Sequence, residues 1–306
     1  MYLRYFGLTE KPFSIAPNPE FLFLSERHKE ALAHLTYGLG DAGGFVLLTG
    51  EVGTGKTTIT RSMLAELPSS TQVAFILNPA LSELELLATI CDELEIDYDG
   101  DNATLKSLTD VIKRRLLDNH QAGGHTMLII DEAQHLAPEV LEQLRLLTNL
   151  ETDHKKLLQI VLVGQPELQH LLQRNELRQL AQRITARYHL LPLTEPQVFA
   201  YIKHRLEKAG CQQALFHHDA VAYIHHITGG IPRLINLLAD RCLLGAYSAS
   251  QTQVSKAMAM QAAQEALPTS IVTPSTTTKR PMPWAFLAWL LALFVAGFGV
   301  ARLGGI

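Results

Sequence analysis

The feature that most constrains this 306-residue chain is the stretch from Gly43 to Arg61. An apolar run of strand length, residues 45–48, leads into a loop that reads Gly50-Glu51-Val52-Gly53-Thr54-Gly55-Lys56-Thr57-Thr58. The residues after the loop have helical character, so the full G-x-x-x-x-G-K-[ST] pattern stands between a strand and a helix. Only residues without a Cβ easily adopt the dihedral angles that turn successive backbone N–H groups inward. The stretch therefore predicts a loop that wraps a chain of phosphates.

Each residue type in this loop suits that task. Lys56 would place a point charge near the β and γ phosphates, and Thr57 would offer a hydroxyl to Mg²⁺. The backbone N–H groups of Gly50 to Thr58 and the amino end of the next helix would face the anion. We therefore expect ATP with Mg²⁺ as the bound species. The alternative is a glycine-rich turn from strand to helix with a lone exposed lysine.

A second motif follows a short apolar run, residues 126–130, that is typical of a strand buried on both faces. Asp131 and Glu132 come directly after it, where carboxylates are costly unless they serve a cation. Asp131 fits a partner of Mg²⁺, and Glu132 fits the base or positioner of an attacking water. Gln165 follows the next strand, residues 157–163, and would lie beside Asp131 if the two strands are neighbours. The alternative is an Asp-Glu pair that caps the following helix.

The order of these segments predicts an α/β fold of the P-loop class. Alternating strands and helices favour a parallel sheet with helices on both faces and the nucleotide at the carboxyl edge of the strands. At 47% hydrophobic and 18% charged residues, the chain has material for about two ordered domains. We expect a lead-in (1–42), an α/β nucleotide domain (43–191), a small all-helical domain (192–266), a Pro/Ser/Thr-rich linker (267–283) and an apolar segment (284–301).

Several arginines lie outside the two motifs. Residues 175–187 contain Arg178, Arg183 and Arg187, and one of them could reach the γ-phosphate of a neighbouring subunit, where it would offset charge in the transition state. The alternative is a solvated basic face of a helix. Arg233 stands in the first turn of a predicted helix, where the helix dipole does not favour a cation. That position suggests a ligand.

The apolar segment, residues 284–301, carries no charge and would span about 27 Å as a helix, close to the thickness of a bilayer core. Trp284 is placed for the membrane interface, and Lys279 and Arg280 would hold the preceding side in the cytoplasm. We therefore expect a single transmembrane helix with the nucleotide domain in the cytoplasm. The alternative is a buried helix.

The overall charge argues against one class of partner. A net charge of −4 gives no general basic footprint, which counts against nucleic acid as a partner. The three cysteines lack metal-ligand spacing and predict neither a disulfide framework nor a zinc site.

In combination, these motifs resemble the ExeA/GspA family of secretion ATPases, and the related MshM proteins of mannose-sensitive haemagglutinin pilus biogenesis are similar too. The residues that carry the resemblance are Tyr5-Phe6-Gly7-Leu8, Pro12-Phe13, Ala16-Pro17-Asn18-Pro19, the phosphate loop, Asp131-Glu132-Ala133-Gln134, Gly164-Gln165-Pro166-Glu167-Leu168 and Gly230-Ile231-Pro232-Arg233. The resemblance implies an AAA+ module, in which a helical lid follows the α/β domain.

The resemblance also implies roles for single residues. Lys56 and Thr57 would hold nucleotide and Mg²⁺, and Asp131 and Glu132 would form the second motif. Gln165 would be the sensor after a core strand and Arg233 the sensor of the lid. Arg183 or Arg187 would be the finger shared between subunits of a homo-oligomer, and Pro12-Phe13 would lie against the adenine.

At the level of function, the resemblance implies an ATPase of the bacterial inner membrane. It would act with other membrane proteins in assembling a type IV pilus or a type II secretion system. ExeA-like proteins continue into a periplasmic peptidoglycan-binding domain, whereas this sequence ends at Ile306, so we expect an MshM-like pilus role without peptidoglycan binding. The alternative from another class is a DNA-associated regulator that resembles the TniB and TnsC transposition ATPases.

Overall fold

The computed structural model describes residues 2–16, 18–38, 44–77, 79–152 and 156–267. The expected linker beyond residue 267 and the expected transmembrane helix, residues 284–301, lie outside these ranges. Among the helices within them, none is both long and apolar enough to cross a membrane.

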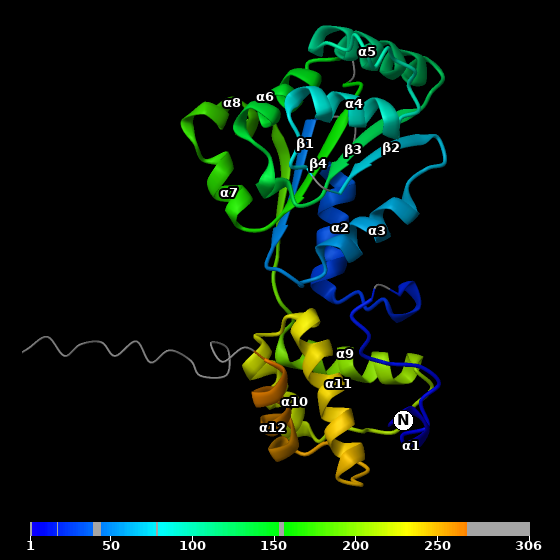
Figure 1. Ribbon diagram of the computed structural model, residues 1–306, viewed down its shortest axis with the longest axis vertical. Coiled ribbons are helices and arrows are strands. Elements are labelled where there is room, and N and C mark those ends of the chain that lie inside the picture. Colours follow the sequence, from blue (N-terminus) through cyan, green and yellow to red (C-terminus); the bar gives the residue numbers. More distant parts are fainter. Residues whose placement is uncertain (1, 17, 39–43, 78, 153–155, 268–306) are drawn as a thin grey trace, which may run out of the picture. The chain divides into compact units, whose positions relative to one another are not determined.

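Five parallel strands form one sheet in the order β2-β3-β4-β1-β5 (Figure 1). The predicted parallel sheet is therefore confirmed. Because all strands run the same way, the loops that carry the predicted site residues leave from one edge of the sheet. The strands are β1 (Gly44–Gly50), β2 (Thr71–Ile76), β3 (His125–Ile130), β4 (Gln159–Gly164) and β5 (Ile184–Leu190).

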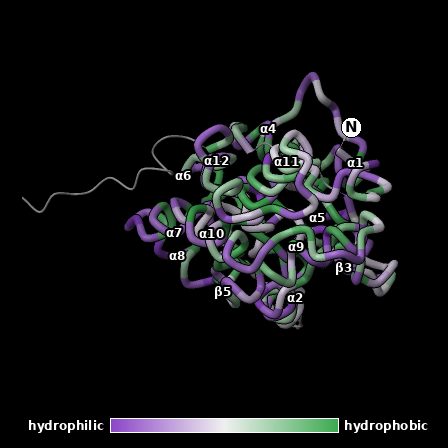
Figure 2. The backbone as a smooth tube through the Cα atoms, turned by 90° about the horizontal axis from the view of Figure 1, so that it is seen from below, coloured by the Kyte–Doolittle hydropathy of each residue, from purple (hydrophilic) through white to green (hydrophobic). Residues whose placement is uncertain are grey.

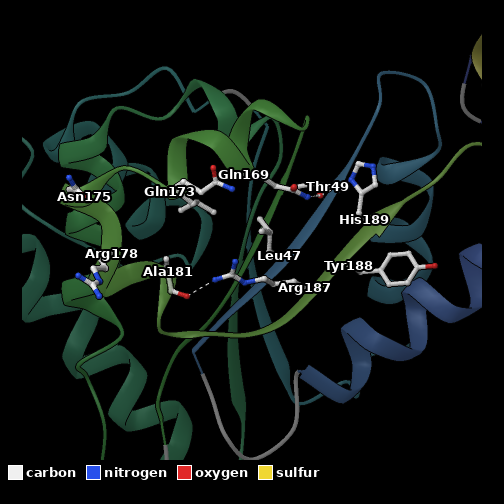
Figure 3. Close-up of a pocket in the computed structure, with 11 residues that line it drawn as sticks. Leu47, Thr49, Gln169, Gln173, Asn175, Arg178, Ala181, Arg187, Tyr188 and His189 are labelled. Atoms are coloured by element: carbon white, nitrogen blue, oxygen red, sulfur yellow. Dashed lines mark hydrogen bonds between the residues drawn. The ribbon is translucent and has the colours of Figure 1, made fainter.

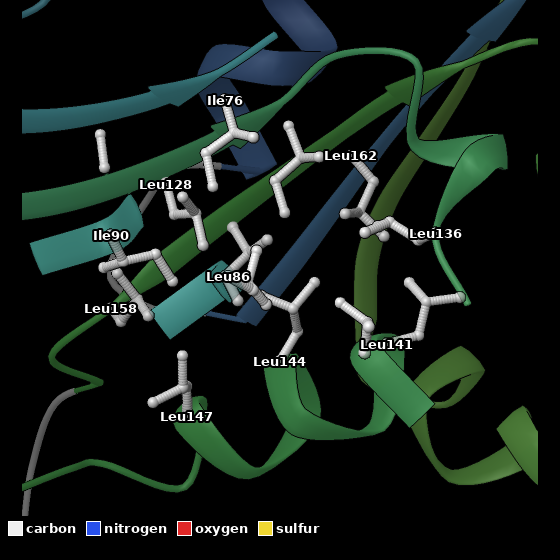
Figure 4. Packing of buried hydrophobic residues seen from close by; sticks show 14 of the residues in the cluster. Ile76, Leu86, Ile90, Leu128, Leu136, Leu141, Leu144, Leu147, Leu158 and Leu162 are labelled. Carbon is white, nitrogen blue, oxygen red and sulfur yellow. The ribbon is translucent and has the colours of Figure 1, made fainter. Parts of the chain in front are cut away.

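Helices cover both faces of the sheet, because alternate side chains of each strand point to opposite faces. Phe45 and Leu47 of β1 pack into one apolar cluster, and Val46 and Leu48 into another. In the first cluster, helix side chains lie directly on Leu128 and Leu162 of the sheet (Figure 4). The helices of the first face are α4 (Glu83–Glu93), α5 (Leu105–Gln121), α6 (Pro138–Leu147), α7 (Glu167–Leu172) and α8 (Arg178–Ala181), and those of the second are α2 (Glu26–Gly38) and α3 (Lys56–Glu66).

The residues after the sheet form helices, and their role as a lid stays a prediction. The lid helices are α9 (Glu195–Lys208), α10 (His218–Thr228), α11 (Pro232–Ser248) and α12 (Lys256–Ala266). The first part of the lead-in packs on these helices. The short helix α1 (Tyr2–Tyr5) places the Tyr2 hydroxyl against Asp240 of α11, and Thr9 N donates to Ala209 O at 2.9 Å. The other described short helices are the 3₁₀ turns η1 (Pro19–Phe21), η2 (Ala133–His135) and η3 (Asn175–Leu177).

The arginine-rich stretch, residues 175–187, is not one continuous helix. β5 begins at Ile184 and places Arg187 on the strand beside Leu47 of β1, so the alternative of a basic helix face does not hold for Arg187. Ile184 and Thr185 are β-branched and favour a strand. Exposed and better-buried residues alternate along β5, which is the period of a strand covered on one face.

Candidate functional site: the phosphate loop and its surroundings

The phosphate loop joins β1 to α3 and has the backbone conformation that its glycines predict. Gly53 and Gly55 have φ of 83° and 106°, in the left-handed region that residues with a Cβ rarely adopt. Gly55 caps α3, and no side chain caps the first N–H groups of that helix. The amino end of α3 thus presents backbone donors of the kind that bind an anion.

Lys56 lies inside the loop. Its Nζ donates to Gly50 O at 2.8 Å and to Glu51 O at 3.1 Å, and the residue is only 7% exposed. Burial lowers the pKa of Lys56, and the charges of Glu132 and Asp131 partly offset that effect. The loop therefore holds a cation at its centre.

The structure brings together the two residues that we predicted to hold Mg²⁺. Thr57 Oγ1 donates to Asp131 Oδ2 at 3.2 Å, although 73 residues separate them in the chain. The contact forms because β3 ends level with the start of α3 at the same sheet edge. Burial raises the pKa of Asp131, and the hydrogen bond from the Glu132 N–H to Asp131 Oδ1 opposes that shift. A hydroxyl and a carboxylate this close provide the hard oxygen ligands that Mg²⁺ prefers.

Glu132 has a different environment from its neighbour Asp131. Its backbone is left-handed, with φ 52° and ψ 36°, which is rare for a residue with a side chain. Two amides hold its carboxylate, since Gln134 Nε2 donates to Oε2 at 2.6 Å and Gln165 Nε2 donates at 3.2 Å. Burial acts to raise the pKa of Glu132, but these hydrogen bonds together with the charge of Lys56 outweigh it, so the pKa is lowered. We expected Gln165 beside Asp131, whereas it lies beside the next residue, Glu132.

Gln134 is a residue of this site whose role we did not predict. While its Nε2 donates to Glu132, its Oε1 accepts from Gln165 N at 3.0 Å. One amide therefore links the loop after β3 to the loop after β4. A Cβ on Gly164 would lie 2.8 Å from Gln134 Oε1, so the glycine makes room for this link.

The lid reaches the phosphate loop through Arg233. Its N–H donates to Gly53 O at 3.3 Å, and a Cβ added to Gly53 would lie 2.6 Å from the Cβ of Arg233. The Arg233 side chain is exposed and makes no hydrogen bond or ion pair within the described residues. The structure therefore places the arginine predicted as lid sensor next to the loop.

His28 is a second residue that the sequence did not reveal. It lies on α2, is 4% exposed, and its Nε2 is 3.3 Å from Thr54 O in the phosphate loop. Its Nδ1 is 2.6 Å from Ser25 Oγ. These contacts fit a neutral ring in which Ser25 donates to Nδ1 and Nε2–H donates to the carbonyl, and burial lowers the pKa of His28 accordingly. Nothing in the pattern around His28 connects it with a loop 26 residues away.

The remaining predicted residues lie away from these contacts. Phe13 is 1% exposed and packs edge-on against Phe216 with ring centroids 5.9 Å apart, and Arg205 of α9 donates to Pro12 O. This pair packs on the lid, and its contact with adenine stays a prediction. Arg183 donates to Arg145 O at 3.1 Å and to Thr148 Oγ1 at 2.9 Å, whereas Arg187 is exposed and donates to Ala181 O at 2.6 Å. That Arg183 or Arg187 reaches the nucleotide of a second subunit stays a prediction.

Comparison with known proteins agrees with this geometry. Residues 40–172 match the family model described as an AAA domain. The chain is 62% identical over 248 residues to General secretion pathway protein A from Aeromonas hydrophila. The chain is a relative of the ExeA/GspA proteins. The match covers 81% of this chain but 45% of that protein, so the chain spans less than half of the length of this GspA relative. The family resemblance is thus confirmed, whereas a particular closeness to MshM is not supported.

Solved structures with a similar fold extend the comparison of this chain with known proteins. Cdc6p from Pyrobaculum aerophilum matches with a TM-score of 0.65 at 19% identity, over 84% of this chain and 70% of that one. A Drosophila ORC structure bound to DNA matches with a TM-score of 0.64 at 19% identity, over 85% and 65% of the two chains. The RuvB branch migration motor of Thermotoga maritima gives 0.52 at 20% identity, over 79% and 69%. At such identities these matches show a shared fold, which is the AAA+ α/β fold.

Proposed function

We propose that the chain binds ATP at the phosphate loop and hydrolyses it with Mg²⁺. The observation that carries the proposal is the convergence of four separate segments on the loop. Lys56 and Thr57 come from α3, Asp131 and Glu132 follow β3, Gln165 follows β4, and Arg233 comes from the lid. The uncapped start of α3 and the left-handed glycines fit a phosphate chain.

The residues divide the work by their chemistry. The loop backbone, including the N–H groups of Glu51, Val52 and Thr58, and Lys56 would bind the phosphates. Thr57 and Asp131 would hold Mg²⁺, which when bound neutralises charge on the phosphates. Glu132 would hold the attacking water as a base or positioner, because its lowered pKa keeps it ionised. Water would add to the γ-phosphorus and the bond to the bridging oxygen would break, which gives ADP and phosphate.

Two further residues would sense the phosphates. Gln165 already donates a hydrogen bond to Glu132, so a movement of Gln165 would change the hydrogen bonding of that carboxylate. Arg233 lies on the loop with an exposed guanidinium, which suits contact with a phosphate oxygen. We also propose that a homo-oligomer shares the site and that Arg183 or Arg187 reaches the nucleotide of the next subunit.

The similarity to General secretion pathway protein A supports a place in secretion. We propose an ATPase of the bacterial inner membrane, with its nucleotide domain in the cytoplasm and residues 284–301 as a single anchor. It would work with membrane proteins that assemble a type II secretion system or a type IV pilus. The alternative, a DNA-associated regulator, predicts salt-dependent binding of duplex DNA, which the first proposal does not require.

Phosphate release by the full chain tests this proposal. We expect turnover that needs Mg²⁺ and that stops when a chelator removes it. If the site is shared, Arg183→Ala or Arg187→Ala should lose activity, and mixing with Lys56→Ala should restore part of it. Full activity in both arginine variants would contradict a shared site, and no phosphate release under any condition would contradict hydrolysis.

A further inference from the structure

A basic groove lies beside the edge strand β5, on the face of the sheet that α7 and α8 cover only in part. Its volume is about 460 Å³. Leu47, Leu172 and Ala181 give it apolar walls, and Figure 3 shows Arg187 between Leu47 and Ala181. The segment around α7 and α8 is mainly hydrophilic in Figure 2. We call this cavity the β5 groove, and its remaining lining residues are Thr49, Gln169, Gln173, Asn175, Arg178, Arg187, Tyr188 and His189.

The β5 groove carries positive charge without a matching negative charge. Arg178 and Arg187 line it, and none of its eleven lining residues is acidic. Arg187 uses one contact, to Ala181 O at 2.6 Å, and Arg178 has no side-chain hydrogen bond or ion pair among the described residues. A guanidinium has five N–H donors and stays protonated, so both arginines can take a carboxylate.

A matching negative charge lies elsewhere in the chain. Residues 92–101, which we call the acidic segment, expose six carboxylates, and none of these forms an ion pair within the described residues. Three of them accept only hydrogen bonds from neutral groups, for example Asp99 from Asn102 Nδ2 at 2.9 Å. The six residues are Asp92, Glu93, Glu95, Asp97, Asp99 and Asp101.

The acidic segment and the β5 groove lie at opposite edges of the sheet. Glu93, at the end of α4, accepts a hydrogen bond from Phe75 N of β2 at 3.0 Å, which fixes the start of the segment at the β2 edge. Four strand spacings separate β2 from β5, about 19 Å. The segment of one chain therefore does not reach its own groove.

We propose that the acidic segment of one copy docks into the β5 groove of a second copy. The two surfaces differ, so the contact is head-to-tail and adds copies in one direction until a ring closes or a filament grows. Charge complementarity would select the pairing and its register. Arg187 would then pair with a carboxylate of the partner copy, and Arg183 would be the candidate for the shared nucleotide site. The docking does not depend on ATP hydrolysis.

Charge reversal in the full chain tests the docking. One variant, Arg178→Glu with Arg187→Glu, reverses the groove. Another replaces four carboxylates of the segment with lysine and changes its charge from −6 to +2; the substitutions are Glu95→Lys, Asp97→Lys, Asp99→Lys and Asp101→Lys. We expect sedimentation at low ionic strength, with ATP and Mg²⁺, to show assembly of the wild type and at least about 10-fold weaker assembly of each variant. Arg241→Glu, on an exposed position of α11, is the matched control and should assemble like the wild type.

Mixing the two reversed variants gives the most specific readout. In a mixture, each reversed groove meets a reversed segment and each native groove meets a native segment, so assembly should return with the variants alternating. All six substitutions in one chain should also restore assembly. These rescues exclude misfolding as the cause of the loss.

Three results would overturn the proposal. The first is a wild type that stays monomeric, and the second is normal assembly of both reversed variants. The third is a mixture that stays dissociated although each variant is folded by circular dichroism. If inorganic phosphate binds to monomeric wild type and not to the groove variant, the groove is a site for small anions instead.

Discussion

The two sides of the phosphate loop differ in how they are held together. On the β3 side, Asp131 and Glu132 are charged groups tied by hydrogen bonds to Thr57, Gln134 and Gln165. On the α2 side, the neutral pair of Ser25 and His28 holds the loop carbonyl of Thr54. The first side carries groups that can act on a phosphate or a water, and the second supports the loop from behind.

This difference separates the chemistry of the site from its shape. Loss of a charged group on the β3 side should change turnover more than affinity, because those groups act on the reacting atoms. Loss of a contact that shapes the loop should weaken nucleotide binding, since the loop N–H groups would no longer be held in place. Four substitutions around the loop test that division.

Glu132→Gln should have the largest effect. We expect phosphate release to fall by at least about 100-fold, because the amide can no longer accept a proton from water. ATP affinity should stay near that of the wild type, so bound ATP should accumulate. Rapid-quench analysis of the bound nucleotide measures both effects. Glu139→Gln, an exposed carboxylate at the start of α6, is the control, and normal turnover in Glu132→Gln would show that the role belongs elsewhere.

Gly53→Ala should weaken ATP binding by about 30-fold. A side chain at φ 83° costs about 1–2 kcal/mol, and its Cβ would lie 2.6 Å from the Cβ of Arg233. Either effect moves the loop or the lid. Calorimetric titration with ATP measures the change, and Gly100→Ala, where a Cβ meets nothing within 4 Å, is the control. Unchanged affinity would mean that the loop and Arg233 are not in contact in solution.

Gln134→Leu should reduce turnover by about 10-fold with little change in affinity, because a hydrogen bond to a charged group is worth about 1.5–3 kcal/mol. Its loss should also raise the pKa of Glu132, which the amides hold low, so the acid limb of the turnover profile should move to higher pH. A pH series of phosphate release with Gln182→Leu as control checks this. A profile that drops uniformly, without the shift, would contradict positioning of Glu132 by Gln134.

His28→Asn should have the smallest effect, about a 3-fold loss of affinity at neutral pH. Its pH dependence is more informative. Burial lowers the pKa of His28, so the unfolded chain takes up a proton first as pH falls below about 6.5. Denaturant unfolding should therefore show a decline in the free energy of unfolding from pH 6.5 downward, by up to about 1.4 kcal/mol per pH unit, that is smaller in His28→Asn.

His34→Asn, on the same helix, is the control for His28 because it is exposed. It should keep the pH dependence of the wild type. If His28→Asn and the wild type lose stability in parallel as pH falls, His28 is not a neutral support of the loop.

The sequence predicts the charged groups of the site better than the contacts that shape the loop. Lys56 and Thr57 begin the helix after the phosphate loop, and Asp131 and Glu132 directly follow β3. A local pattern therefore reports each pair, and the parallel sheet then brings them together. Gln165 was predicted by the same reasoning. We expected Gln165 beside Asp131 if the strands before them are neighbours. Gln165 does reach the loop after β3, but it contacts Glu132 instead of Asp131.

Contacts from distant segments follow no local pattern. His28 reaches Thr54 because α2 packs on the sheet beside α3, and an amphipathic pattern does not say which polar residue of a helix faces a loop. Gln134 was visible next to Glu132, but its link to Gln165 depends on the left-handed backbone at Glu132. The strand position of Arg187 was missed because basic residues hid the alternation of β5.

A calorimetric titration of the full chain with ATP and Mg²⁺ tests directly whether a triphosphate binds in the phosphate loop. We expect saturable binding of one ATP per chain to the wild type and no measurable binding to Lys56→Ala, with both proteins folded by circular dichroism. No binding to folded wild type, or equal binding to both proteins, would contradict it.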